Sequence, residues 1–182
     1  MSLYVLTVCT YNRTRSVLMG ALVGHHMACL GVDGFIATAG VDGPAGKQAT
    51  NQVVQLLARR GIDVSEHRSS FVNAQLVSEA DLILCAEVRH VTHIASKWPE
   101  AFTRTFTLPE LVDRSLTVGR MGEAGFDRWI GRLNEDRPRG VHYLSNPYIA
   151  EVDDPTGQVG RVWEDSFTQI DRLCHRTARL LR

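Results

Sequence analysis

Residues 9–16 read Cys9-Thr10-Tyr11-Asn12-Arg13-Thr14-Arg15-Ser16. An apolar run at residues 3–8 comes directly before this stretch, and a pattern typical of a helix starts directly after it, at Val17. A strand, a short loop and a helix in this order place a cysteine at the base of a loop and an arginine at its end. Because backbone N–H groups at helix N-termini bind anions, the stretch predicts an oxyanion-binding loop that holds a nucleophile.

The residue types in this loop suit phosphoryl transfer through a cysteine. The thiolate is the nucleophilic form of cysteine, and a helix N-terminus and nearby cations favour it. Arg15 has a planar guanidinium that can hold two oxygens of a tetrahedral dianion, and Ser16 can donate a hydrogen bond to the sulfur of Cys9. The alternative is a buried structural cysteine at a strand end, with two arginines exposed beside it.

A route through a phosphocysteine also needs an acid for the leaving oxygen and later a base for water. One carboxyl group can serve in both steps. Asp154 is the best candidate. Pro155 restrains the backbone of Asp154, the residue that precedes it, and Thr156-Gly157 continues a surface turn. Asp153 competes for the role, and an ordinary acidic turn before the last helix is the alternative.

Strand and helix patterns alternate along the chain, which favours a parallel sheet covered by helices. Strands are predicted at residues 3–8, 35–39, 81–86 and 104–108, and helices at residues 16–30, 47–60, 72–79, 90–97, 109–114, 124–134 and 161–181. The predicted fold class is therefore α/β: one domain over residues 1–182, with a four-stranded parallel sheet, helices on both faces, and a phosphate loop between the first strand and the first helix. Residues 113–150 are expected to form a surface excursion with a helix around Trp129.

The position of the loop agrees with this fold. Ligands of open α/β sheets bind beyond the carboxyl ends of the strands. Cys9 lies at such an end, and so do residues 38–40 at the end of the second predicted strand.

Composition narrows the classes of partner. The chain has 182 residues, and Lys+Arg and Asp+Glu each number 20, so bulk charge predicts neither a nucleic-acid partner nor an anionic membrane. No apolar run approaches the length of about 18 residues that a spanning helix needs, and the N-terminus lacks a secretory pattern.

Four scattered cysteines without a CxxC pair are typical of a reducing compartment, so a cytoplasmic location is expected. Cys29 and Cys85 are expected to be buried apolar residues.

Neither a metal nor a cofactor is expected. His90 and His93 lie three residues apart on a predicted helix, and His25 and His26 are adjacent. Neither pair has a carboxylate or thiolate at a spacing typical of metal sites.

With these motifs in place, the chain resembles the low-molecular-weight protein tyrosine phosphatases and the thiol-dependent arsenate reductases built on the same scaffold. The resemblance covers almost the whole length and rests on motifs in a fixed order: the Cys-x5-Arg-Ser loop, Thr38-Ala39-Gly40, Gly61-Ile62-Asp63, His67-Arg68-Ser69, the run at residues 80–85, and Asp154-Pro155 before a final helix.

The resemblance implies a role for each residue of the site. Cys9 would be the nucleophile, Arg15 the phosphate-binding cation and Asp154 the general acid. The remaining loop residues would bind the substrate: Thr10, Tyr11, Asn12, Arg13, Thr14 and Ser16. Asn12 would hold the loop in shape through a left-handed backbone, with Thr38 and His67 as its partners.

Three positions depart from the family pattern. The family usually has glycine where Tyr11 stands, a second cysteine where Thr14 stands, and an aromatic residue where Thr156 stands. The second cysteine can trap an oxidised nucleophile as a disulfide, and this chain lacks that trap. The changes at Tyr11 and Thr156 leave the reaction class unaffected but alter the walls that would hold a phosphotyrosine.

Three hypotheses follow. The first is a phosphomonoester hydrolase, in particular a protein tyrosine phosphatase, whose substrate is a phosphorylated protein or a small phosphomonoester. Phosphoarginine is open within this class, since Tyr11 and Arg13 would border the mouth of the site. The second is an arsenate reductase that uses an external thiol, and the third is an inactive phosphoprotein-binding module. The oligomeric state is not predicted.

Overall fold

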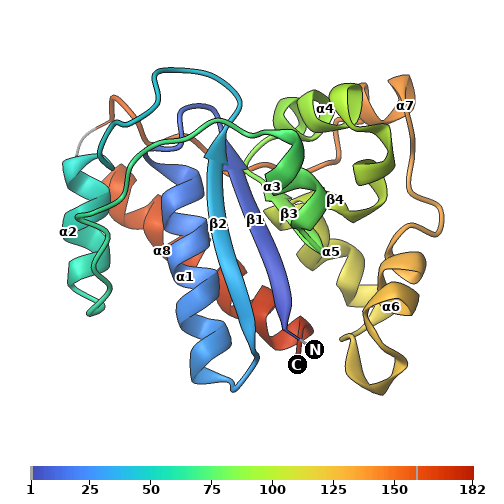
Figure 1. The fold of residues 1–182 in the computed structure, drawn as a ribbon. Coiled ribbons are helices and arrows are strands. Elements are labelled where there is room, and N and C mark those ends of the chain that lie inside the picture. The colour runs from blue at the N-terminus through green and yellow to red at the C-terminus, as the bar shows by residue number, and fades with distance from the viewer. Residues whose placement is uncertain (1, 159) are drawn as a thin grey trace.

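The centre of the protein is a parallel sheet of four strands in the order β2-β1-β3-β4 (Figure 1). A computed structural model describes residues 2–158 and 160–182. The strands are β1 Leu3–Cys9, β2 Gly34–Gly40, β3 Leu82–Cys85 and β4 Thr105–Thr107. The predicted sheet is confirmed. Because β1 pairs with both β2 and β3, Cys9 stands at the carboxyl end of a central strand.

The predicted helices are also present. They are α1 Arg15–Cys29, α2 Asn51–Ala58, α3 Ala74–Glu79, α4 Val88–Lys97, α5 Leu108–Val118, α6 Phe126–Leu133, α7 Val141–Leu144 and α8 Arg161–Leu180, with 3-10 turns η1 Pro99–Arg104 and η2 Gly122–Ala124. The second helix starts later than the predicted residue 47, because Lys47 is engaged by the backbone and hydroxyl of Ser69 instead. The short helix α7 was not predicted.

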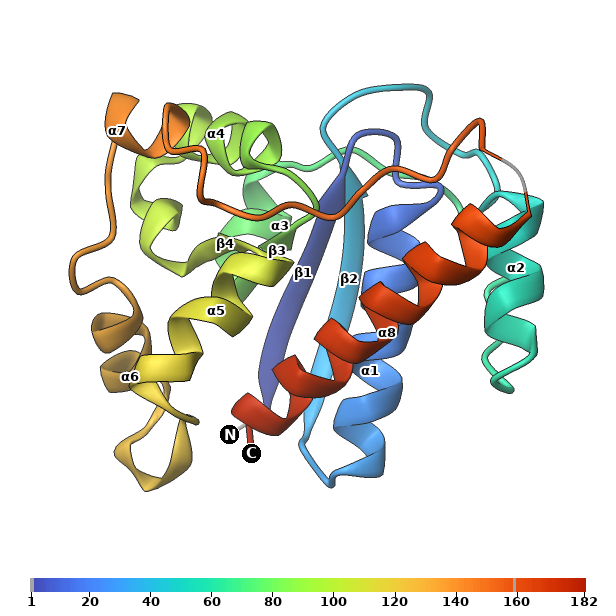
Figure 2. The same ribbon diagram turned by 180° about the vertical axis from the view of Figure 1, so that it is seen from behind.

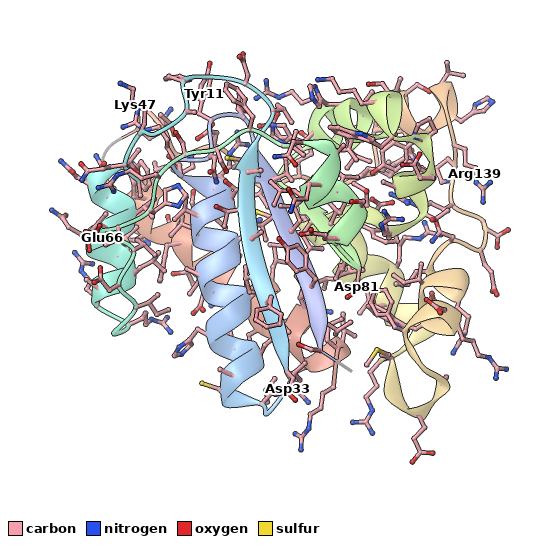
Figure 3. All side chains as sticks on the ribbon, viewed as in Figure 1. Tyr11, Asp33, Lys47, Glu66, Asp81 and Arg139 are labelled. Atoms are coloured by element: carbon pink, nitrogen blue, oxygen red, sulfur yellow. The ribbon has the colours of Figure 1, made fainter. Side chains whose placement is uncertain are left out.

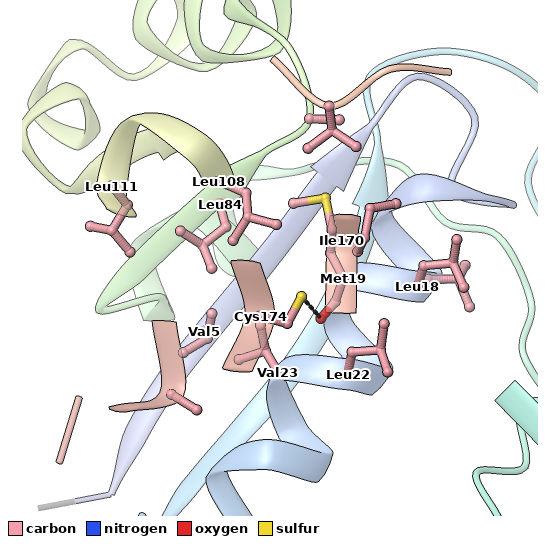
Figure 4. Close-up of a cluster of buried hydrophobic side chains, with 14 of the residues drawn as sticks. Val5, Leu18, Met19, Leu22, Val23, Leu84, Leu108, Leu111, Ile170 and Cys174 are labelled. Atoms are coloured by element: carbon pink, nitrogen blue, oxygen red, sulfur yellow. Dashed lines mark hydrogen bonds between the residues drawn. The ribbon is translucent and has the colours of Figure 1, made fainter. Parts of the chain in front are cut away.

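Helices cover both faces of the sheet. Alternate strand residues point to opposite faces. Val5, Leu82 and Leu84 join the larger core with α1, α5 and α8, whereas Leu6 and Ile83 join a second core with α3 and α4. Figure 2 shows α1, α5 and α8 over the back of the sheet. Figure 4 shows this core at close range, where residues of α1 and α8 pack together and the thiol of Cys174 contacts Met19 O at 3.7 Å.

The end of β2 is shaped to receive the loop after β1. A Cβ atom on Gly40 would lie 2.6 Å from the carbonyl oxygen of Thr10 and 3.0 Å from the nitrogen of Asn12. No side chain fits at these separations. Glycine at position 40 therefore allows the loop to pack directly on the neighbouring strand end.

Two expectations need correction. Residues 113–150 are not simply a surface excursion, because Trp129, Arg137 and Tyr143 are buried. Arg137 lies inside a charged stretch of sequence, yet aromatic rings enclose its side chain. No periodic pattern in the sequence predicts this burial.

The second correction concerns Cys29, which was expected to be buried and is exposed at the last residue of α1.

None of the helices in the described residues is long and apolar enough to cross a membrane.

Candidate active site

The loop between β1 and α1 forms a cradle of backbone N–H groups. Residues 10–14 connect the strand to the helix, and the N–H groups of residues 11–14 donate to no other group in the described part of the chain. Cys9 is buried at the base of the cradle, with its Sγ 3.0 Å from the hydroxyl of Ser16. Free donors beside a thiol and a helix N-terminus make this loop suited to an oxyanion.

Asn12 holds the loop in shape. Its φ of 52° lies in the left-handed region, which asparagine tolerates better than most residues. Its side-chain nitrogen donates to Ser16 Oγ at 3.0 Å and to Thr38 Oγ1 at 2.7 Å. Its carbonyl oxygen accepts from Nε2 of His67 at 2.7 Å. Thr38 and His67 are thus the partners that the resemblance implied.

Arg15 is buried, with 2% of its side chain exposed, and has three partners. It forms an ion pair with Glu87, donates to Val152 O at 3.1 Å, and forms an ion pair with Asp154 at 2.8 Å. These contacts engage both terminal nitrogens, Nη1 and Nη2. Nε has no hydrogen-bond partner among the described residues, so this donor and the second N–H of Nη2 are available for an anion.

Asp154 is brought to Arg15, and Asp153 is not. The segment before it is tied to the sheet, because Val152 N donates to Ala86 O at 2.8 Å. The side chain of Asp154 is 43% exposed, and it also accepts from Thr156 N at 3.0 Å. Asp154 is therefore near both Arg15 of the thiol loop and solvent.

Three residues of the site were missed in the sequence: Glu87, Arg89 and His90. Glu87 pairs with both Arg15 and Arg89. Burial acts to raise the pKa of Glu87, but hydrogen bonds from Arg89 and Arg15 outweigh it and lower that pKa to about 2. The signal that could have found these residues is their position directly after β3, at the same sheet edge as Cys9.

His90 is fully buried and links Glu87 to the loop. Glu87 N donates to Nδ1 of His90 at 3.1 Å, so the ring proton resides on Nε2, which lies 3.1 Å from Thr10 Oγ1. Burial lowers the pKa of His90 to about 4, so the ring is neutral at pH 7. His90 is thus engaged in hydrogen bonds, and no group of three or more metal-ligating side chains gathers within residues 2–158 and 160–182.

A small hollow of about 70 Å³ opens over Cys9 and is lined by Thr10, Tyr11, Arg13, Thr14, Arg15, Thr50, Asp154 and Thr156. Tyr11 stands at the exposed end, where Figure 3 labels it. A Cβ on Gly43 would lie 2.4 Å from its ring, so Gly43 makes room for the ring. Nε of Arg13 donates to Gln48 O at 2.9 Å on the rim. All the loop residues proposed from the sequence therefore surround one hollow or support it.

The chain is similar in sequence to known phosphatases. A family model described as low molecular weight phosphotyrosine protein phosphatase matches residues 4–119. A protein of Ralstonia nicotianae, described as a probable low molecular weight protein-tyrosine-phosphatase EpsP, is 30% identical over 71% of this chain and 94% of its own. A protein-arginine-phosphatase of Geobacillus stearothermophilus is 32% identical over 59% of this chain and 70% of its own.

Solved structures show the same fold. The crystal structure of a low molecular weight protein tyrosine phosphatase from T. tengcongensis has a TM-score of 0.72 and 25% identity, and the match covers 98% of this chain and 99% of that one. A mutant of YwlE from Bacillus subtilis has a TM-score of 0.73 with 24% identity over 98% and 97% of the two chains. The chain belongs to the low molecular weight phosphotyrosine protein phosphatase family.

Proposed function

We propose that this phosphatase hydrolyses phosphotyrosine in proteins through a phosphocysteine on Cys9, with Asp154 as general acid and base. The observation that carries the proposal is the convergence on one hollow of a thiol, a buried arginine and a carboxyl group that contacts that arginine. These are the parts that transfer of a phosphoryl group to sulfur requires.

The reaction follows from the contacts. Sγ of Cys9 attacks phosphorus while Arg15 and the loop N–H groups hold the phosphoryl oxygens. The bond to the leaving oxygen breaks, and protonated Asp154 supplies the proton that this oxygen needs. Asp154 then takes a proton from water, which attacks phosphorus and releases inorganic phosphate and the thiolate. Ser16, 3.0 Å from Sγ, stabilises that thiolate.

The rim of the hollow supports tyrosine over arginine as the phosphorylated residue. Both Tyr11 and Thr156 line the hollow, and of these two residues only Tyr11 supplies an aromatic wall. Arg13 and Arg89 place guanidinium groups at the rim and beside Thr10. A phosphorylated arginine would bring another guanidinium toward these cations, whereas a phenyl ring carries no such charge.

The cysteines support hydrolysis over arsenate reduction. Thr14 occupies the loop position where a second thiol would stand, and Cys85 is buried in the sheet. Burial raises the pKa of the Cys85 thiol well above its usual value, which disfavours the thiolate needed for a relay. Arsenate reduction would have to depend on an external thiol, and arsenate-dependent thiol consumption measures it directly.

The first test is phosphate release from p-nitrophenyl phosphate. Cys9→Ser is expected to abolish release, because a serine hydroxyl is not ionised near neutral pH and an alkoxide is a poor leaving group. Asp154→Asn is expected to lower kcat about 100-fold or more for alkyl phosphates, whose leaving oxygen needs a proton, and less for p-nitrophenyl phosphate. Asp153→Asn is the matched control and should retain activity. Full activity of Asp154→Asn on poor leaving groups would reject Asp154 as the acid.

The second test compares substrates. A phosphotyrosine peptide and a phosphoarginine peptide of the same sequence are assayed with wild type and with Tyr11→Ala. We expect a higher kcat/KM for phosphotyrosine, and a selective loss of that activity in the variant. A preference for phosphoarginine in wild type would contradict the assignment of the substrate.

A further inference from the structure

A second concave, positively charged surface lies between α5 and α8. A groove of about 410 Å³ is lined by four arginines, Arg120, Arg176, Arg179 and Arg182, together with Val112, Ser115, Leu116 and Leu180. Within the described residues, none of the four guanidinium groups has an ion pair or a hydrogen bond. The protein as a whole has no net charge, whereas the residues that line this groove include four arginines and no acidic residue.

The backbone holds the groove in shape. Met121 N donates to Leu180 O at 2.8 Å, which joins the segment after α5 to the end of α8. Figure 2 shows the two helices side by side on the back of the molecule. Leu116 is 69% exposed at the groove, and Leu180 is partly buried, so apolar surface lies among the charges. Apolar surface ringed by cations is typical of a binding surface for an anionic partner that also carries an apolar group.

Helix dipoles explain only part of this arrangement. Cations are favoured at helix C-termini, and Arg120, Arg179 and Arg182 lie near the ends of α5 and α8. That effect acts on each helix separately. It does not require guanidinium groups from two helices to surround one groove, where they repel one another.

The shape of the surface favours an elongated partner. A second hollow of about 650 Å³ adjoins the groove along α8, and Arg176 lines both hollows. Its other lining residues are Asp165, Thr168, Gln169, Arg172, Leu173 and His175, and the acidic one, Asp165, is paired with Arg161 at 3.8 Å. From Arg172 to Arg182 a helix rises about 15 Å, the length of roughly five residues of extended peptide. A flat membrane surface fits a concave track poorly, and the lining of the groove offers no aromatic platform for a nucleotide base.

We propose that this track binds an acidic polypeptide segment that carries an aliphatic side chain, with its carboxylates on the arginines and its aliphatic group on Leu116 and Leu180. The site is remote from catalysis. The 20 residues of α8 span about 30 Å, and its first turn follows the segment that carries Asp154, whereas Arg172, Arg176 and Arg179 lie in its last three turns. A bound segment therefore leaves the hollow over Cys9 open.

The test uses the full chain and a fluorescein-labelled peptide, Glu-Glu-Leu-Glu-Glu-Leu-Glu, measured by fluorescence anisotropy at 50 and 300 mM salt. We expect binding that weakens with salt, and a Kd at least 10-fold higher in the double variant R176A/R179A. A matched double variant on α6, R128A/R132A, removes the same charge elsewhere and should bind as wild type does. Hydrolysis of p-nitrophenyl phosphate should be unchanged in both variants and by saturating peptide, which shows that the variants are folded.

Several outcomes would overturn the proposal. They are absence of binding at 50 mM salt, equal weakening in R128A/R132A, or peptide binding that competes with inorganic phosphate at the hollow over Cys9. Stronger arginine-dependent binding of phosphatidylserine vesicles or of tripolyphosphate would instead assign the track to a membrane or to a small polyanion. Because hydrolysis is measured separately, a failure here does not bear on the proposed phosphatase mechanism.

Discussion

Thr10 has a hydroxyl group whose hydrogen-bond direction is set by its neighbours. Its oxygen accepts from Nη2 of Arg89 at 2.8 Å and from the protonated Nε2 of His90 at 3.1 Å. Both acceptor positions of the hydroxyl are then used, so its own proton is left for a third group. Since Thr10 lines the hollow over Cys9, an oxyanion bound there is the acceptor we expect.

This leads to a prediction on binding. Thr10→Val keeps the shape but removes the hydroxyl, and it also leaves Arg89 and His90 without an acceptor. We expect the inhibition constant of inorganic phosphate to rise about 10-fold, which corresponds to a lost hydrogen bond to a charged group. Thr10→Ser should stay close to wild type. An unchanged inhibition constant in Thr10→Val would show that the hydroxyl does not reach the anion.

Glu87 pairs with Arg15, so we expect it to affect the reaction through that arginine. Glu87→Gln keeps the shape but removes the negative charge that fixes the guanidinium, so Arg15 is held less firmly. We expect kcat/KM for p-nitrophenyl phosphate to fall about 10-fold or more. The control is Arg89→Ala, which leaves the Arg15–Glu87 pair in place and should lower kcat/KM by a smaller factor. An equal effect of both variants would contradict a specific role of Glu87 toward Arg15.

At the scale of elements, a buried ion pair anchors the chain that returns to the site. Arg137 pairs with Glu110 at 2.8 Å, donates to Thr105 O at 2.6 Å, and stacks 4.1 Å from the Phe106 ring centroid. Glu110 also accepts from the hydroxyl of Tyr143 at 2.7 Å. These contacts join α5, β4 and α7, which precede the segment of Asp154.

The pair yields a prediction on stability. Arg137→Ala leaves the carboxylate of Glu110 buried without its cation, so the free energy of unfolding should fall by about 3–5 kcal/mol. Arg137→Lys should retain only part of the lost stability, because an ammonium group cannot make the bidentate contact with a carboxylate. Urea unfolding of both variants, beside the exposed-site control Arg139→Ala, checks this. A loss below about 1 kcal/mol in Arg137→Ala would indicate that the pair is not important for stability.

The elements differ in how far the sequence could predict them. The strands and long helices carry apolar patterns that local sequence displays, and the loop of Cys9 lies between two of them. Asp154 could be chosen because proline and glycine mark its turn. Arg137 and Tyr143 could not, since their burial depends on aromatic rings from distant segments. Glu87 and His90 were missed for a related reason: their partners Arg15 and Thr10 are more than 70 residues away.

For the whole molecule, the buried groups of the site make stability depend on pH. His90 has a pKa of about 4 in the folded protein, below the usual value of 6.5. Between these values the unfolded chain binds more protons than the folded one, so stability is complete above about pH 6.5 and falls as the pH drops toward 4. Glu87, with its pKa lowered from 4.5 to about 2, adds a further loss below about pH 4.5.

Urea unfolding between pH 4.5 and 7.5 separates the two groups, because this window contains the titration of His90 and little of Glu87. We expect the free energy of unfolding of wild type to fall by on the order of 2 kcal/mol across it. His90→Gln should be less stable at pH 7 but should lose less on acidification, since its buried side chain no longer gains a proton on unfolding. His142→Gln, at an exposed position, should follow wild type. If the stability of His90→Gln depends on pH as steeply as that of wild type, other groups are responsible for the acid sensitivity. His90 would then not be the neutral, buried residue that connects Glu87 to Thr10 through hydrogen bonds.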